Sequence, residues 1–206
     1  MRFRATLSMI VICLLATPFA HAGLATVGPI SGMEATGDKG LITSIDGIAV
    51  EDLILGISTF AGDPKHAQYP PQDGDNFDLN LIASGDDQAY IQTMFSQSVE
   101  TIYLIENNGN DDAVLQGLDA GGNPIGATLD LVKADYLKTG FKTVNNQVAS
   151  GVIVTTDAPV FGIRLSPPSS GALGFDPVSV SAVVPEPMTI SLLGLGAVAM
   201  LRRRRS

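Results

Sequence analysis

Short runs of β-branched, aliphatic and aromatic residues recur along this chain of 206 residues, and clusters of Gly, Asn, Asp and Pro separate them. Such runs are typical of the strands of a β-sandwich or barrel. Ten stretches fit the pattern: residues 41–45, 52–60, 77–83, 89–95, 99–106, 113–120, 127–132, 148–155, 160–165 and 178–183. No stretch shows a helical period of comparable strength. The sequence therefore predicts an all-β domain, an antiparallel, jelly-roll-like β-sandwich over residues 41–183.

The middle of the chain predicts two consecutive hairpins. An apolar run over residues 101–105 is followed by the turn cluster 107–112 and then by a second run over 113–119. The glycine-rich stretch 121–126 turns the chain again, toward a further strand. Residues 134–143 have mixed polarity, and they predict a short helical turn or a crossing loop.

Two other stretches carry weaker or divided patterns. Residues 23–40 are rich in Gly, Ala and Thr, and they predict a flexible lead-in or an edge segment. Residues 152–165 contain two strong β runs on either side of Asp157, Ala158 and Pro159. Because Asp and Pro are common turn residues, this tripeptide predicts a turn between two strands.

Residues 1–22 predict a helical secretory signal peptide. Two arginines stand at its start, residues 7–15 are apolar, and Ala20 and Ala22 frame a cleavage site. Export through the Sec translocon and cleavage after Ala22 are therefore expected. The only cysteine, Cys13, lies within this segment, so we expect no disulfide bond in the exported protein.

The end of the chain combines an apolar stretch with a cluster of arginines. Residues 188–201 are 14 uncharged residues. As a helix they would span roughly 21 Å, less than the roughly 30 Å of a bilayer's hydrocarbon core, which predicts a short transmembrane helix. The four arginines that follow would stay on the cytoplasmic side. Pro185 and Pro187 predict extended backbone just outside the membrane, where a processing enzyme can reach it.

Together these features resemble the PEP-CTERM sorting signal of Gram-negative bacteria, placed at residues 184–206. The residues that carry the resemblance are Val184, Pro185, Glu186, Pro187 and Thr189, and then Arg202, Arg203, Arg204 and Arg205. The resemblance implies processing by exosortase, a membrane enzyme, after transient membrane anchoring. It also implies a place at the cell surface, with exopolysaccharide or biofilm. An ordinary single-pass anchor with an incidental Pro-Glu-Pro is the alternative.

The charge of the central part excludes one class of partner. Of the 12 Lys and Arg residues, only six lie within residues 23–183, whereas 20 of the 21 Asp and Glu residues do, so this part carries a formal charge of −14. A domain of this charge repels the phosphate backbone of nucleic acids and anionic membrane surfaces. We therefore expect no nucleic-acid partner.

Two acidic loops invite a calcium prediction. The residues are Asp73, Asp75 and Asp78 in the first loop and Asn110, Asp111 and Asp112 in the second. Flexible oxygen ligands are what Ca²⁺ prefers, although the spacing is not that of an EF-hand. Because Asp and Asn are also common turn residues, solvated acidic turns are the alternative.

Candidate catalytic residues are few, and we expect a secreted, non-catalytic protein rather than an enzyme. His66 is the only histidine left after signal cleavage, with neither a nucleophile elbow nor a zinc ligand set. The alternative is a secreted polysaccharide hydrolase that uses two carboxylates. The glutamates available to it are Glu34, Glu51, Glu100 and Glu106. The chain has no Trp and four Tyr, so few side chains can stack on a sugar ring.

Overall fold

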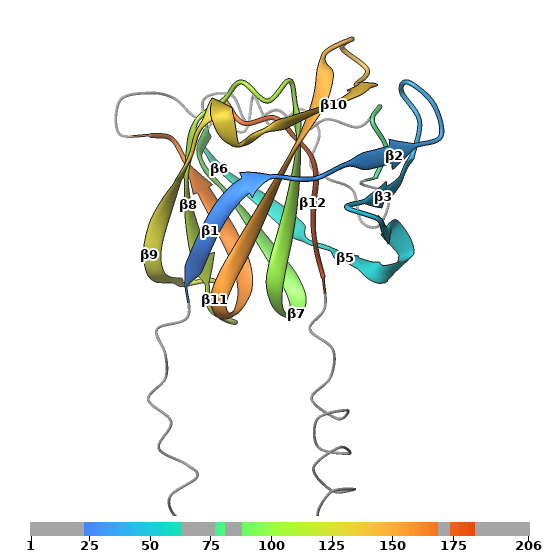
Figure 1. The fold of residues 1–206 in the computed structure, drawn as a ribbon. Coiled ribbons are helices and arrows are strands. Elements are labelled where there is room, and N and C mark those ends of the chain that lie inside the picture. Colours follow the sequence, from blue (N-terminus) through green and yellow to red (C-terminus); the bar gives the residue numbers. More distant parts are fainter. Residues whose placement is uncertain (1–22, 63–76, 81–87, 169–173, 184–206) are drawn as a thin grey trace, which may run out of the picture.

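The protein folds into two antiparallel sheets (Figure 1). The computed structural model describes residues 23–62, 77–80, 88–168 and 174–183. The main sheet holds β1 (Leu24–Pro29), β5 (Leu53–Leu55), β6 (Ile57–Gly62), β7 (Gln88–Asn107), β8 (Ala113–Leu118), β9 (Pro124–Leu131), β10 (Leu137–Lys142), β11 (Val148–Ser166) and β12 (Pro177–Val183). The small sheet holds β2 (Met33–Ala35), β3 (Ile42–Ile45) and β4 (Ile48–Ala49). The prediction of an all-β, antiparallel fold is confirmed.

Helical structure is limited to two short 3₁₀ helices, η2 (Val50–Asp52) and η3 (Lys133–Asp135), within the described ranges. The two terminal helices predicted from the sequence, over residues 1–22 and 184–206, lie outside these ranges. Among the described residues, no helix is long and apolar enough to cross a membrane.

Two long strands, β7 and β11, hold the main sheet together. The second half of β7 pairs with β12 and with the first half of β11. The first half of β7 pairs with β6 and with the second half of β11, which in turn pairs with β8. The register shifts between Thr155 and Val160 and again before Gly162, so β11 bends where it passes from one half of the sheet to the other. Whether the fold is a jelly-roll-like sandwich stays a prediction.

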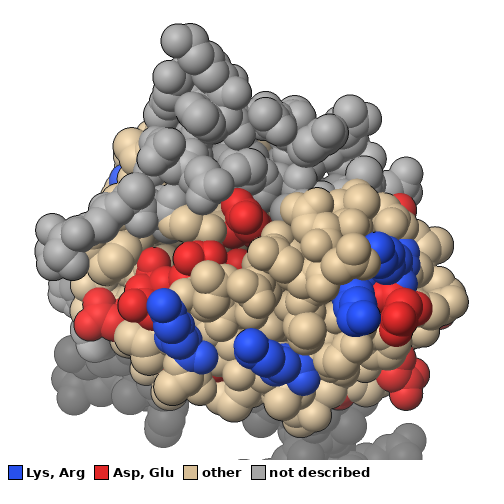
Figure 2. Space-filling model, turned by 90° about the horizontal axis from the view of Figure 1, so that it is seen from above, with Lys and Arg blue, Asp and Glu red and all other residues tan. Residues whose placement is uncertain are grey.

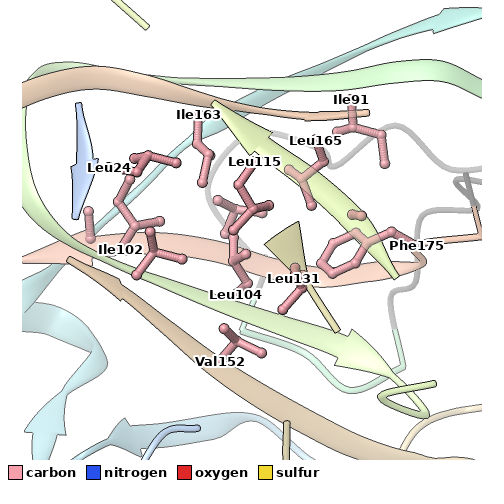
Figure 3. Close-up of a cluster of buried hydrophobic side chains, with 14 of the residues drawn as sticks. Leu24, Ile91, Ile102, Leu104, Leu115, Leu131, Val152, Ile163, Leu165 and Phe175 are labelled. Atoms are coloured by element: carbon pink, nitrogen blue, oxygen red, sulfur yellow. The ribbon is translucent and has the colours of Figure 1, made fainter. Parts of the chain in front are cut away.

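The two halves enclose one core, the main core. Its fully or nearly fully buried members come from both halves: Leu24, Ile91, Phe95, Val99, Ile102, Leu104, Ala113, Leu115, Leu131, Tyr136, Val152, Val154, Val160, Ile163, Leu165, Phe175, Val180 and Ala182. Figure 3 shows Leu115, from β8, beside Leu104, from β7, inside this core. Because side chains alternate along a strand, Tyr103 and Ile105 of β7 point the other way, into a second core. The run 101–105 is nearly continuous in apolar residues because this part of β7 is covered on both faces.

The second core lies under the small sheet. Ile42 and Ile45 of β3, and Leu79 from the short described segment 77–80, are buried there against Tyr103 and Ile105 of β7. Segment 77–80 forms turns and one isolated bridge, Leu41 with Asp78, rather than the strand predicted over 77–83.

The N-terminal stretch decides between two predicted alternatives. Residues 23–40, expected to be a flexible lead-in or an edge segment, contain β1 and β2, and β1 lies at an edge because, among the described strands, it pairs with β11 alone. Strand β1 pairs with β11 from Leu24 to Pro29, and Ile30 is buried in the second core. The backbone hydrogen bonds of the sheet order this stretch although its small residues give little pattern.

The order of the strands in the main sheet corrects the prediction of a hairpin after β7. The predicted hairpin between 101–105 and 113–119 is wrong, because β11 lies between β7 and β8 in the sheet. The second hairpin, β8 with β9, is confirmed, and the Asp119 Oδ1 closes its turn by accepting the N–H groups of Gly121 and Asn123 at 2.8 and 2.9 Å. The turn predicted at 157–159 is instead a bend within the continuous strand β11. Residues 134–143, predicted to be a short helical turn or a crossing loop, include strand β10.

Both described chain ends lie at one end of the main sheet, here called the terminal end (Figure 1). Val183, the last residue of β12, pairs with Thr101 of β7; Thr101 pairs with Thr155 of β11, and Thr155 with Thr26 of β1. The opposite end, the loop end, carries residues 107–112 after β7. The two described chain ends therefore lie on one row of the sheet, three strands apart, at the end away from the loop end.

Candidate functional site

Carboxyl groups gather at the loop end. Four segments contribute them: the end of strand β7, the connection from β7 to β8, the helix η3, and the residues just before β12. The members are Glu106, Asp111, Asp112, Asp135 and Asp176, which act electrostatically on one another or on Tyr136. Figure 2, seen from above the loop end, shows acidic side chains collected on this face. We call this set the loop-end cluster.

Glu106 is the buried member of the loop-end cluster. Its side chain has no solvent exposure, and its Oε2 accepts the N–H of Gly109. Asn108 and Gly109 have φ angles of 102° and 61°, so the chain turns sharply back over the carboxyl group. A Cβ at position 109 would lie 2.4 Å from the Cβ of Ser150, so only glycine fits.

The pKa of Glu106 is raised to about 8, chiefly because burial disfavours its charged form. The carboxylates of Asp111 and Asp176 raise it further, and the Gly109 N–H opposes the increase. The other oxygen, Oε1, receives no N–H or O–H donor from the described residues. Glu106 can bond the Asp111 carboxyl only while one of the two carries a proton. Near neutral pH, Glu106 is therefore mostly a neutral acid.

Hydrogen bonds around Asn107 tie the loop end together. Thr143 Oγ1 donates to Asn107 Oδ1 at 2.5 Å, and Asn107 Nδ2 donates to Gln147 Oε1. The main-chain N–H of Asn107 donates to the carbonyl of Asp176 at 3.0 Å. Tyr136, whose pKa is raised mainly by burial, donates its hydroxyl to the carbonyl oxygen of Asp111 at 3.0 Å. These hydrogen bonds tie residues 107–111 to Tyr136, to the turn 143–147 and to Asp176.

The residues predicted to bind calcium are only partly brought together. Asp73 and Asp75 lie outside the described ranges, and Asp78 accepts the N–H of Asn80 at 2.8 Å. In the second loop, Asn110 is exposed, Asp111 is next to Glu106, and Asp112 accepts the main-chain N–H of Lys133 at 3.0 Å. Within the described ranges, no three His, Cys, Asp or Glu side chains are placed to hold one metal ion. Calcium binding stays a prediction.

Among the predicted carboxylates, Glu106 has the raised pKa that a general acid needs, but a fully buried side chain cannot contact a polysaccharide. Glu34, Glu51 and Glu100 are exposed and stand on β2, η2 and β7 respectively. His66 lies outside the described ranges.

The special environment of Glu106 was missed from the sequence, although a signal existed. Glu106 follows Ile102 and Leu104 at intervals of two, so on a strand it points to the same side as these two core residues. A charged residue in phase with a buried face is the pattern that could have identified it.

The comparison with protein-family models found one match. The model described as PEP-CTERM protein-sorting motif matches residues 183–205. The predicted sorting residues all lie within it: Val184, Pro185, Glu186, Pro187, Thr189, Arg202, Arg203, Arg204 and Arg205. The predicted resemblance is confirmed: the chain carries a PEP-CTERM sorting motif at its C-terminus, while the role of each of these residues stays a prediction. Searches of curated proteins and of solved structures found no match. The predicted cleavage residues Ala20 and Ala22 lie outside the described ranges.

Proposed function

We propose that this protein is a non-catalytic component of the cell surface or extracellular matrix. It is exported through the Sec translocon, held briefly in the membrane by its C-terminal segment, and processed by exosortase. It then acts as a β-sandwich domain in contact with exopolysaccharide or biofilm. The observation that carries the proposal is the position of the sorting motif, whose first matched residue, Val183, is also the last residue of the folded sheet.

The position of the two termini fits delivery from a membrane. Thr26 and Val183 are three strands apart on one row of the sheet, and at about 4.8 Å between neighbouring strands this separation is about 14 Å. The signal peptide and the sorting segment therefore attach to the same end of the domain. During processing, the terminal end faces the membrane and the loop end points away from it.

The charge of the domain supports release rather than lasting contact with lipid. Residues 23–183 carry a formal charge of −14, and the acidic loop-end cluster is at the end farther from the attachment points. Anionic lipid headgroups repel such a surface. Once the C-terminal segment is processed, electrostatics favours a domain that leaves the membrane surface.

A non-catalytic role is supported by the state of Glu106. Its carboxyl group is buried inside the protein, where it accepts the Gly109 N–H and helps to order the loop end. The alternative, a polysaccharide hydrolase, would need an acid that substrate can touch.

Replacing Pro185, Glu186 and Pro187 together with alanine should block processing. The hydrophobic segment would remain, so we expect the full-length protein to accumulate in the membrane fraction of the producing cells. Removing residues 184–206 should instead yield a soluble exported protein that is never membrane-bound. Immunoblots of membrane, periplasmic and medium fractions would measure both outcomes.

Glu51→Ala is the matched control for these variants, because it removes an exposed glutamate of the folded domain far from the motif in sequence. This variant should be processed like the wild type. If the triple-alanine variant reached the same size and the same fraction as the wild type, the proposed sorting route would be wrong.

A further inference from the structure

A row of polar side chains crosses the outer face of the main sheet. One residue from each of five adjacent strands contributes: Thr59 of β6, Gln92 of β7, Arg164 of β11, Gln116 of β8 and Thr128 of β9. The register places each residue directly opposite the next. Their neighbours along the strands, Ile91, Leu115 and Ile163, are buried in the main core, so the row faces the other way. We call it the polar row.

The centre of the polar row is held in place. Arg164 Nη2 donates to Gln92 Oε1 at 2.7 Å, and the guanidinium lies 4.5 Å from the ring centroid of Tyr90. Gln92, Arg164 and Gln116 are half-buried. Cation–π contact and the hydrogen bond fix the plane of the guanidinium before any ligand arrives.

The polar row has spare hydrogen-bonding capacity. An arginine has five N–H donors: Nη2 of Arg164 donates to Gln92, and its Nε is buried without an acceptor among the described residues, so the spare donors that a ligand can reach are those of the two Nη nitrogens. The Gln116 amide donates to the carbonyl oxygen of Gly126 at 3.4 Å, a long contact that a better acceptor can replace. Thr59 and Thr128, at the two ends, are exposed; the Thr59 hydroxyl donates to the carbonyl oxygen of Gln92 at 3.3 Å, and its oxygen can still accept a hydrogen bond. Amides and hydroxyls both donate and accept, as the hydroxyl groups of a sugar do.

We propose that the polar row binds a neutral polysaccharide laid across the five strands. This inference rests on the proposed function, and it names the surface and the class of matrix polymer. Four steps of about 4.8 Å between strands give a row of about 19 Å, long enough for several sugar rings. Arg164 supplies the only charge of the row, and a domain with a formal charge of −14 repels a polyuronate as a whole. Charge therefore selects the neutral polymer.

Binding to a panel of neutral glucan, mannan and galactan hexasaccharides tests this inference. The processed protein would be titrated by calorimetry, with a hexauronate from alginate as the anionic comparison. We expect at least one neutral hexasaccharide to bind and the hexauronate not to bind. The double variant Gln92→Ala/Gln116→Ala removes at least two hydrogen-bonding groups and should weaken binding about tenfold or more.

Gln97→Ala is the matched control, since Gln97 is an exposed glutamine of the same strand β7 outside the row, and it should leave affinity unchanged. If the double variant proved unstable, Thr59→Ala/Thr128→Ala would test the exposed ends of the row instead. Binding of no neutral hexasaccharide, binding of the hexauronate alone, or equal affinity of a folded row variant would each overturn the inference. If the protein bound no neutral sugar but were sorted normally, the inference about the polar row would be wrong and the proposed sorting route would stand. If the sorting experiment failed while a neutral hexasaccharide still bound to the polar row, the proposed sorting route would be wrong and the binding site would stand.

Discussion

The free energy of unfolding should fall as the pH rises from about 4.5 to about 8, and Glu106→Gln should remove most of the fall. Folded Glu106 keeps its proton to a higher pH than unfolded Glu106, because burial and Asp111 disfavour its charged form. Between the two pKa values the folded state binds more protons, so stability decreases with pH. The contribution is fully present below pH 4.5 and is lost as the pH passes through 8.

The raised pKa sets the size of this effect. The pKa of Glu106 rises from its ordinary value of 4.5 to about 8. At about 1.4 kcal/mol for each pKa unit, the free energy of unfolding can fall by at most about 5 kcal/mol because of this group. Glutamine resembles the protonated acid: its carbonyl can accept the Gly109 N–H and its amide can donate to Asp111. The variant should match the wild type near pH 4.5 and exceed it by about 2 to 5 kcal/mol at pH 8.

Urea unfolding at several pH values between 4.5 and 8 measures both curves. Glu100→Gln is the control, since it makes the same chemical change at an exposed position of the same strand, β7. Its curve should run parallel to that of the wild type. Parallel curves for Glu106→Gln and the wild type would mean that Glu106 is ionised in the folded protein across this range.

Gly162→Ala should destabilise the domain by about 3 kcal/mol or more. Gly162 stands in β11 where the strand passes between β7 and β8. An added Cβ would lie 2.4 Å from the carbonyl oxygen of Thr93 and 2.8 Å from Met94 Sδ. The methionine can move, but the carbonyl oxygen is part of the sheet backbone. Accommodating the methyl group would force the two strands apart at the bend.

Gly28→Ala is the matched control for this glycine. Gly28 also lies in a strand, β1, and a Cβ there would meet no atom within 4 Å. Its substitution should change stability by less than about 1 kcal/mol, partly because alanine restricts the unfolded chain. Chemical unfolding of both variants gives the comparison. A Gly162→Ala protein as stable as Gly28→Ala would show that the bend has room to relax.

Much of the strand content could be predicted from local sequence, whereas the pairing of the strands could not. The run 101–105 was correctly assigned to a strand because it is nearly continuous in apolar residues. The turn cluster 107–112 then suggested a hairpin. Turn residues report that the chain reverses, and they carry no information about which strand becomes the neighbour. Here β11, 36 residues beyond Asp112, occupies that place.

Strand β10 was missed, and the N-terminal stretch was left between two alternatives, for a related reason. Leu137, Thr139 and Phe141 alternate with polar residues and glycine, but the two lysines made this segment resemble a loop. Strand β1 has small residues and gains its order from hydrogen bonds to β11. Main-chain hydrogen bonds of this kind do not require particular side chains, so a single sequence does not reveal them.

The functional residues also divide into those that local sequence predicts and those that only the fold brings together. The sorting motif could be predicted because its parts follow one another in the chain, and no folded structure is needed to bring them together. The environment of Glu106 depends on Asp111, Asp176 and Tyr136, which approach from three connections. Only the three-dimensional path of the chain shows that these groups meet.

The position of β12 has a mechanical consequence. This strand leads directly to the sorting segment, and it lies between β5 and β7 in the sheet. Its hydrogen bonds to β7 run at right angles to the strand, as in any antiparallel pair. A load applied along the tail while the protein is still in the membrane acts on all of these bonds together in shear. The sheet is therefore attached through one of its internal strands, so the domain should withstand traction from its surroundings until the tail is cut.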